Sequence, residues 1–232
     1  MKKNLLLLLM VFAALNLFSQ IEKGNISIGI NGNYTRMNTQ NGVTTNLNYT
    51  KGQYLNAGVD IGYFITDRLI AGAGLDYIGN KETRYNSVYF NNFLQMEEMD
   101  LKSKAFLPNV YLGYYYKVVS KLYFSTTLKF SYGKIKTEYS TTFAGGGPFT
   151  DSNGTIQSNS DPYVKGSNGD SETDLFSAQI YPEVMYFITG KFGVCLNLGG
   201  IAYSINDWET NNSGFAINFK PDYWRFGIKF RL

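Results

Sequence analysis

Hydrophobic and polar residues alternate along most of the chain beyond residue 20, in short runs with a period of two. Residues 56–77, with the sequence NAGVDIGYFITDRLIAGAGLDY, show the pattern clearly, because two alternating runs flank a polar turn. Successive side chains of a β-strand point to opposite faces, so this stretch predicts a β-hairpin. No segment beyond residue 20 keeps the period of an amphipathic helix over a useful length.

Eight alternating runs follow one another, and the connections between them alternate in length. The short connections are ITDRL, VVSKL and ITGKF, and the long ones cover residues 38–52, 80–103, 140–174 and 206–220. Short turns at one end and long loops at the other are typical of an antiparallel meander. The sequence therefore predicts an all-β, eight-stranded antiparallel up-and-down barrel, with strands near 24–37, the two arms of 56–77, 104–118, 122–138, 175–188, 192–205 and 224–232.

The two faces of these strands differ in composition, and this difference decides which face points outward. A soluble ligand-binding barrel turns its apolar face inward, whereas an outer-membrane barrel turns it toward lipid. The polar face is rich in glycine, with Ser, Thr and Asn between, where a water-facing surface would carry long charged side chains. Repeated glycine fits the crowded interior of a small barrel, where it leaves room for larger neighbours such as Tyr111, Tyr115 and Tyr181. We therefore expect a transmembrane barrel.

Aromatic residues bracket the apolar runs, and they make up 16% of the chain against 17% for charged residues. Two aromatic belts are expected where a membrane protein crosses the two lipid–water interfaces, although aromatics are also common in ordinary sheets. One group lies beside the short turns and the other nearer the long loops: Tyr63, Tyr116, Phe124, Tyr186 and Phe192, then Tyr34, Tyr77, Tyr132 and Phe176.

The first residues have the organisation of a secretory signal peptide. Met1, Lys2 and Lys3 precede the short uncharged run LLLLLMVFAALNLF, which ends in Ser19 and Gln20. We expect residues 1–19 to be removed and residues 20–232 to form the barrel domain. The one cysteine, Cys195, excludes an intrachain disulfide and is expected to be buried, and the net charge of +3 gives no indication of nucleic-acid binding.

Two stretches carry a resemblance to a known family: FLPNVYLGYYYKV before a short turn, and the ending WRFGIKFRL. In these and in its architecture the chain resembles the eight-stranded outer-membrane barrels, the OmpA/OmpX-like small barrels in the style common in Bacteroidetes-type bacteria. The resemblance implies an integral place in the outer membrane of a Gram-negative cell, contact with lipid and lipopolysaccharide, and short turns and both termini in the periplasm. It also implies a C-terminal insertion signal read by the barrel-assembly machinery: Trp224, Phe226, Ile228, Phe230 and Leu232.

Charged residues on the inward face could carry chemistry. Because they nearly balance in sign and come from different strands, we expect a lumenal network of salt bridges and hydrogen bonds; a narrow proton or ion path is the alternative. Asp170, Glu172 and Asp174, with Asp151 and Asn153, could hold calcium or simply be solvated. The inward charged set is Asp60, Asp76, Lys117, Lys129, Glu183, Arg225 and Lys229.

The chain contains no histidine, so it lacks the base used by the lipid-modifying enzymes among small barrels. We predict no catalytic, cofactor or metal site, and a non-enzymatic barrel with a plugged lumen. Such a barrel stabilises the envelope, or presents its long loops for adhesion or partner binding. The alternative is an accessory subunit of a larger outer-membrane secretion, uptake or barrel-assembly complex.

Overall fold

The computed structural model describes residues 21–41, 48–90, 93–144, 149–150, 156–157, 163–206 and 212–232. The expected signal peptide, residues 1–19, lies outside this described part. Ten strands form one antiparallel sheet, and β6 and β7 form a separate two-stranded one. The strands are β1 Ile26–Asn41, β2 Asn48–Phe64, β3 Leu69–Phe90, β4 Phe93–Lys117, β5 Leu122–Ala144, β6 Phe149–Thr150, β7 Ile156–Gln157, β8 Tyr163–Phe187, β9 Phe192–Asn197, β10 Gly200–Asn206, β11 Asn212–Asn218 and β12 Arg225–Arg231.

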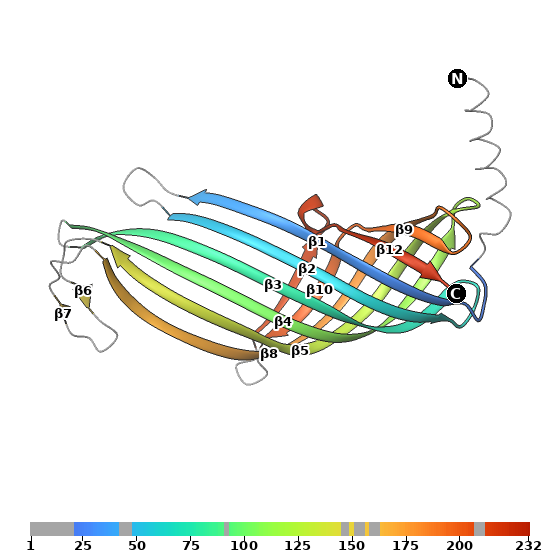
Figure 1. Ribbon diagram of the computed structural model, residues 1–232, viewed down its shortest axis with the longest axis horizontal. Coiled ribbons are helices and arrows are strands. Elements are labelled where there is room, and N and C mark those ends of the chain that lie inside the picture. Colours follow the sequence, from blue (N-terminus) through green and yellow to red (C-terminus); the bar gives the residue numbers. More distant parts are fainter. Residues whose placement is uncertain are drawn as a thin grey trace, which may run out of the picture.

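Eight of the strands close into a ring (Figure 1). Neighbours pair in the order β1, β2, β3, β4, β5, β8, β9 and β12, and β12 returns to pair with β1. Every pairing in the ring is antiparallel, and each connection joins neighbours. The predicted all-β, eight-stranded up-and-down barrel is confirmed. No helix in the described ranges is long and apolar enough to cross a membrane.

Several strands are much longer than the alternating pattern predicted. Strands β3 and β4 have 22 and 25 residues and stay in register to the pair Phe90 and Phe93, so the long loop expected at 80–103 is wrong. The loop expected at 140–174 is also partly strand, since β5 runs to Ala144 and β8 begins at Tyr163. Beyond the apolar runs both faces of these strands carry polar residues, so the period of two fades while backbone pairing continues. Figure 1 shows the long strands extending past the ring as a curved sheet.

The last two strands of the meander are each broken in the middle. Gly199 separates β9 from β10 in the left-handed conformation with φ 79°, and the short 3-10 turn η2 (Pro221–Tyr223) separates β11 from β12. As a result, β12 pairs with β1 only as far as Gly32, and β11 pairs with β10 alone. The turn η2 covers the gap at β1, where the carbonyl of Asp222 accepts hydrogen bonds from the side chains of Asn33 and Thr35 at 3.0 and 2.8 Å.

The glycines of the inward face have the role that the composition indicated. A Cβ on Gly58 would lie 2.5 Å from the Asp76 carboxylate, and one on Gly72 would lie 2.5 Å from the Tyr111 ring. Large inward side chains therefore occupy space that the missing side chains leave. Towards the short turns the interior is apolar, with a buried cluster that includes Phe64, Ile70, Tyr115, Tyr123, Met185 and Phe187.

The outward face of the ring is apolar and exposed. Val110 is 58% exposed and Phe226 67%, which is the reverse of a soluble protein, where such residues fill the core. We call this surface the apolar band. Its members on the ring include Ile28, Ile30, Val59, Ile61, Leu75, Phe106, Val110, Leu112, Phe124, Phe130, Ile180, Val194, Phe226, Ile228 and Phe230.

Candidate functional site: the lumenal polar network

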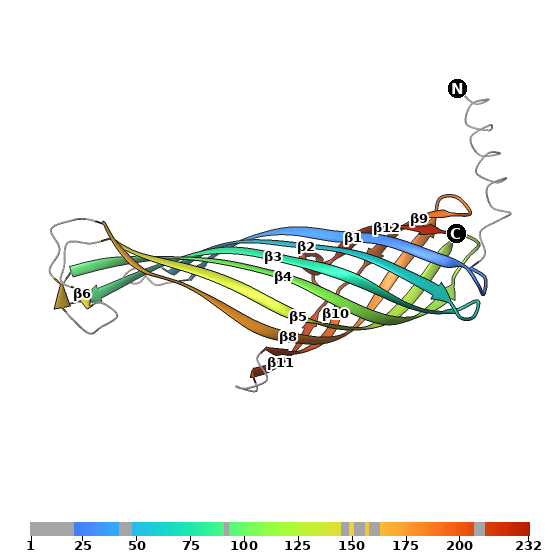
Figure 2. The ribbon, with the colours of Figure 1, turned by 60° about the horizontal axis from the view of Figure 1, so that its bottom comes forward.

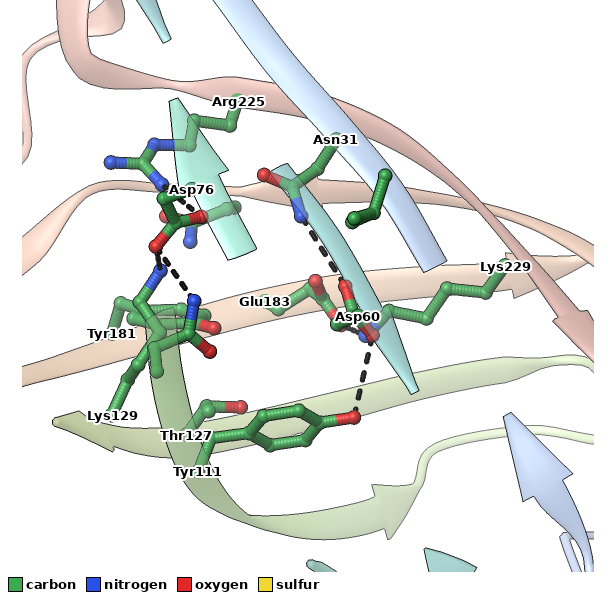
Figure 3. Close-up of a pocket in the computed structure, with 13 residues that line it drawn as sticks. Asn31, Asp60, Asp76, Tyr111, Thr127, Lys129, Tyr181, Glu183, Arg225 and Lys229 are labelled. Atoms are coloured by element: carbon green, nitrogen blue, oxygen red, sulfur yellow. Dashed lines mark hydrogen bonds and ion pairs between the residues drawn. The ribbon is translucent and has the colours of Figure 1, made fainter. Parts of the chain in front are cut away.

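Charged side chains from five strands converge on the middle of the ring (Figure 3). The tight turns and the strict antiparallel register place inward positions of neighbouring strands at similar height, so distant sequence positions meet. They surround a small cavity of about 20 Å³. Six of the seven predicted lumenal residues line it: Asp60 on β2, Asp76 on β3, Lys129 on β5, Glu183 on β8, and Arg225 and Lys229 on β12.

Asp76 is the centre of one half of this network. Its Oδ2 accepts a hydrogen bond from Lys129 Nζ at 2.6 Å and another from Asn109 Nδ2 at 3.1 Å. Arg225 Nη1 lies 3.9 Å from the other carboxylate oxygen. The Lys129 and Asp76 side chains are only 7% and 11% exposed, so neither charge has water as an alternative partner. One carboxylate therefore lies between two cations here.

The second half joins Glu183 and Asp60 to the other strands. Lys229 Nζ donates to Glu183 Oε1 at 2.5 Å and to the Tyr115 hydroxyl at 3.0 Å. The Asp60 carboxylate accepts hydrogen bonds from the Tyr111 hydroxyl at 3.3 Å and from Asn31 Nδ2 at 3.4 Å. Figure 3 shows the two halves side by side, with Asp76, Lys129 and Arg225 in one group and Asp60, Tyr111 and Asn31 in the other.

This arrangement can hold charges, but it offers no obvious reaction centre. A cavity of about 20 Å³ is close to the smallest that admits one water molecule. Each carboxylate is already engaged by a cation or by hydrogen-bond donors from several strands. In the part of the chain that the structure describes, no group of three His, Cys, Asp or Glu residues is placed to hold a metal. Cys195 is free and buried, as expected.

The remaining predicted residues lie elsewhere. Lys117, included among the lumenal charges, ends β4 beside the turn and lines a different hollow with Glu22 and Arg68. Of the five C-terminal signal residues, four lie on the outward face, at 45–67% exposure, while Trp224 precedes β12 and donates from Nε1 to the carbonyl of Phe219. The outward four are Phe226, Ile228, Phe230 and Leu232.

Three of the acidic residues considered for calcium, Asp170, Glu172 and Asp174, are on strand β8 rather than in a loop. Glu172 accepts a hydrogen bond from Lys134 Nζ at 2.7 Å and lies 3.7 Å from Lys136 Nζ. The hydrogen bond from Lys134 lowers the pKa of Glu172, and the same contact raises the pKa of Lys134. Asp151 and Asn153 lie outside the described residues, so the proposed five-residue set is not tested.

Sequence reasoning missed the neutral members of the network. Asn31 and Asn109 each donate a hydrogen bond to a carboxylate of the network, and the hydroxyls of Tyr111 and Tyr115 complete the contacts of Asp60 and Lys229. All four lie on the inward face of their strands. Their positions followed from the alternation, but their hydrogen bonds depend on the register between strands, which the alternation does not give.

Comparisons with known proteins identify no relative by sequence: no family model and no curated protein matches the chain. Among solved structures, Ail, the attachment invasion locus protein of Yersinia pestis, is similar over 90% of this chain and 99% of its own, with 10% identity and a TM-score of 0.34. The CymD monoaromatic hydrocarbon channel covers 90% of this chain and 88% of its own, with 8% identity and a TM-score of 0.28. At these scores the likenesses carry no argument, and the eight-stranded ring rests on the strand pairing itself.

Proposed function

We propose that the protein is an integral outer-membrane β-barrel with a plugged lumen, which holds a sheet and its loops outside the cell for contact with a partner. The apolar band carries this proposal. A closed ring satisfies the backbone hydrogen bonds of its strands internally, which is the condition for crossing hydrocarbon with strands. Aliphatic and aromatic side chains that are half exposed on every strand of the ring would be costly in water and are favourable in lipid.

The plugged lumen is supported by the packing along the barrel axis. The apolar cluster around Phe64, Tyr123 and Met185 fills the end with short turns, and the polar network fills the middle. A second buried cluster of Ala105, Leu107 and Leu175 lies beyond the network. In planar lipid bilayers the folded protein is expected to give no conductance steps. Regular steps in single-protein recordings would replace the plugged barrel with a narrow channel.

The length of the strands supports a role outside the membrane. A transmembrane strand needs about 9–11 residues, whereas β3 has 22 and β4 has 25. The excess lies at the end opposite the short turns, where Figure 2 shows the long strands tapering away from the ring. With both termini in the periplasm, this sheet projects from the cell surface. Since no histidine is present and the lumenal charges are engaged with one another, the role is non-enzymatic: adhesion, partner binding or stabilisation of the envelope.

The test is cross-linking in native membranes followed by mass spectrometry, with cross-linker sites on the projecting part of β3 and β4 and a control set beside the short turns. We expect cross-links from the projecting sites to surface partners and resistance of the protein to extraction without detergent. Recovery of one stoichiometric membrane subunit, linked through the apolar band, would instead favour an accessory role in a larger complex.

A further inference from the structure

The outward face of the long strands becomes basic directly beyond the apolar band. On β1 to β4 the first charged outward residue beyond Tyr34, Leu55, Tyr77 and Phe106 is a cation on every strand. Acidic outward residues follow only further out on β4, at Asp100 and Glu98, and further around the sheet on β5 and β8, where Lys134 and Lys136 pair with Glu172. The outward cations beyond the band on β1 to β4 are Arg36, Lys51, Lys81, Lys102 and Lys104.

A groove of about 320 Å³ lies among three of these lysines. We call it the basic groove. Gly79 creates the hollow, because it lies between Leu55 on β2 and Lys104 on β4 as their cross-strand neighbour and has no side chain to fill the space. The groove is therefore apolar on the side of the band and cationic on the other side. Its lining includes Leu55, Tyr77, Gly79, Lys81, Lys102 and Lys104.

The lysines of the basic groove lie opposite other lysines on the neighbouring strands. Lys81 lies directly opposite Lys102 in the register of β3 and β4, and Lys104 lies directly opposite Lys136 of β5. Like charges directly opposite each other destabilise a sheet. Within the described ranges no ion pair joins Lys81, Lys102 or Lys104 to a carboxylate, and the outward Glu138 opposite Lys102 lies beyond ion-pair distance. An anion from outside the chain would remove this repulsion.

We infer that the basic groove binds the phosphorylated headgroup of a lipid in the outer leaflet, with phosphate between the lysines and acyl chains against the apolar band. This inference rests on the proposed membrane location. Leu55 and Tyr77 line the groove and lie next to the apolar band in their strands, so a single amphiphile can contact both surfaces. Lysine binds phosphate as a point charge, and an aromatic residue such as Tyr77 suits the level of the headgroups.

Native mass spectrometry of the folded protein in detergent micelles tests the lipid site. The probe is a bis-phosphorylated lipid A, and the comparison lipid is its dephosphorylated form. The test variant is Lys81→Gln with Lys104→Gln, and the matched control, Lys117→Gln with Lys191→Gln, removes the same charge beside the short turns, at the other end of the barrel. Each lysine near a lipid surface changes affinity about fivefold, so the test variant should bind the phosphorylated lipid about 25-fold more weakly. The affinity of the control variant for the phosphorylated lipid should change by less than threefold. The dephosphorylated lipid should bind equally weakly to the wild type and to both variants.

Three results would overturn the inference: equal loss in both variants, equal binding of the dephosphorylated lipid, or displacement of the lipid by millimolar inorganic phosphate, which would indicate a site for free phosphate. Detergent dependence of both variants is measured in the same preparations. If the protein stays soluble without detergent, the proposed membrane location is wrong. If the protein needs detergent but binds phosphorylated and dephosphorylated lipid A equally, only the proposed lipid site is wrong.

Discussion

Neutralising Asp76 is the sharpest test of the lumenal network, because this carboxylate holds two cations in place. At an effective dielectric constant of about 20, a pair at 2.6 Å attracts by about 6 kcal/mol and one at 3.9 Å by about 4 kcal/mol. Desolvation of the ions offsets much of this gain, and removal of one member from a buried pair costs about 3–5 kcal/mol. In Asp76→Asn, Lys129 and Arg225 would face each other with no counterion between them, so we expect a loss in this range.

The assay is urea unfolding of the protein folded into lipid vesicles, followed by tryptophan fluorescence. The matched control is Glu172→Gln, which breaks an exposed ion pair with Lys134 and should move the unfolding midpoint little. Adding Lys129→Met to Asp76→Asn removes the stranded cation and should restore part of the lost stability. If Asp76→Asn unfolds at the same urea concentration as the wild type, these charges are hydrated and the assignment of the inward face is wrong.

Three further changes have defined outcomes. Gly199→Ala places a methyl group on a backbone with φ 79°, which costs about 1–2 kcal/mol before any clash, whereas Gly214→Ala, with open space around it, should leave the unfolding midpoint unchanged. Val110→Arg should cost about 2–4 kcal/mol in vesicles if this position lies near the bilayer midplane, and an unchanged midpoint would argue against lipid contact there. Lys134 lowers the pKa of Glu172, so the stabilisation by its carboxylate is present at neutral pH and lost below about pH 4.5; the difference between wild type and Glu172→Gln should vanish there, and a difference that grows on acidification would contradict the contact.

The sequence predicted the ring well because the apolar band imposes the alternation. Positions such as Val59 and Val110 must be apolar where they face outward, and glycine at Gly58 or Gly72 makes room for the carboxylate or ring opposite. The number and order of strands followed from this pattern alone. Beyond Tyr77 the constraint ends and both faces turn polar, so the alternation predicts a loop where the chain continues as a strand.

The site was predictable in its members but not in its pairing. Inward charges follow from the alternation, yet Lys129 could have met Asp60 or Glu183 as well as Asp76, and only the register decides between them. Lys117 alternates like its lumenal neighbours but ends its strand at the turn, where inside and outside no longer differ. The break at Gly199 was equally invisible, because the alternating pattern continues on both sides of it.

The central claim is that the apolar band touches hydrocarbon and that lipid contact ends where the lysines begin. Spin labels placed one at a time on the outward face of β4, in a Cys195→Ser background, test it through collisions with oxygen and with a water-soluble nickel chelate. Labels replacing Leu112, Val110 and Phe106 should collide mainly with oxygen, and one replacing Lys104 mainly with nickel. Nickel contact along the whole row would contradict the account.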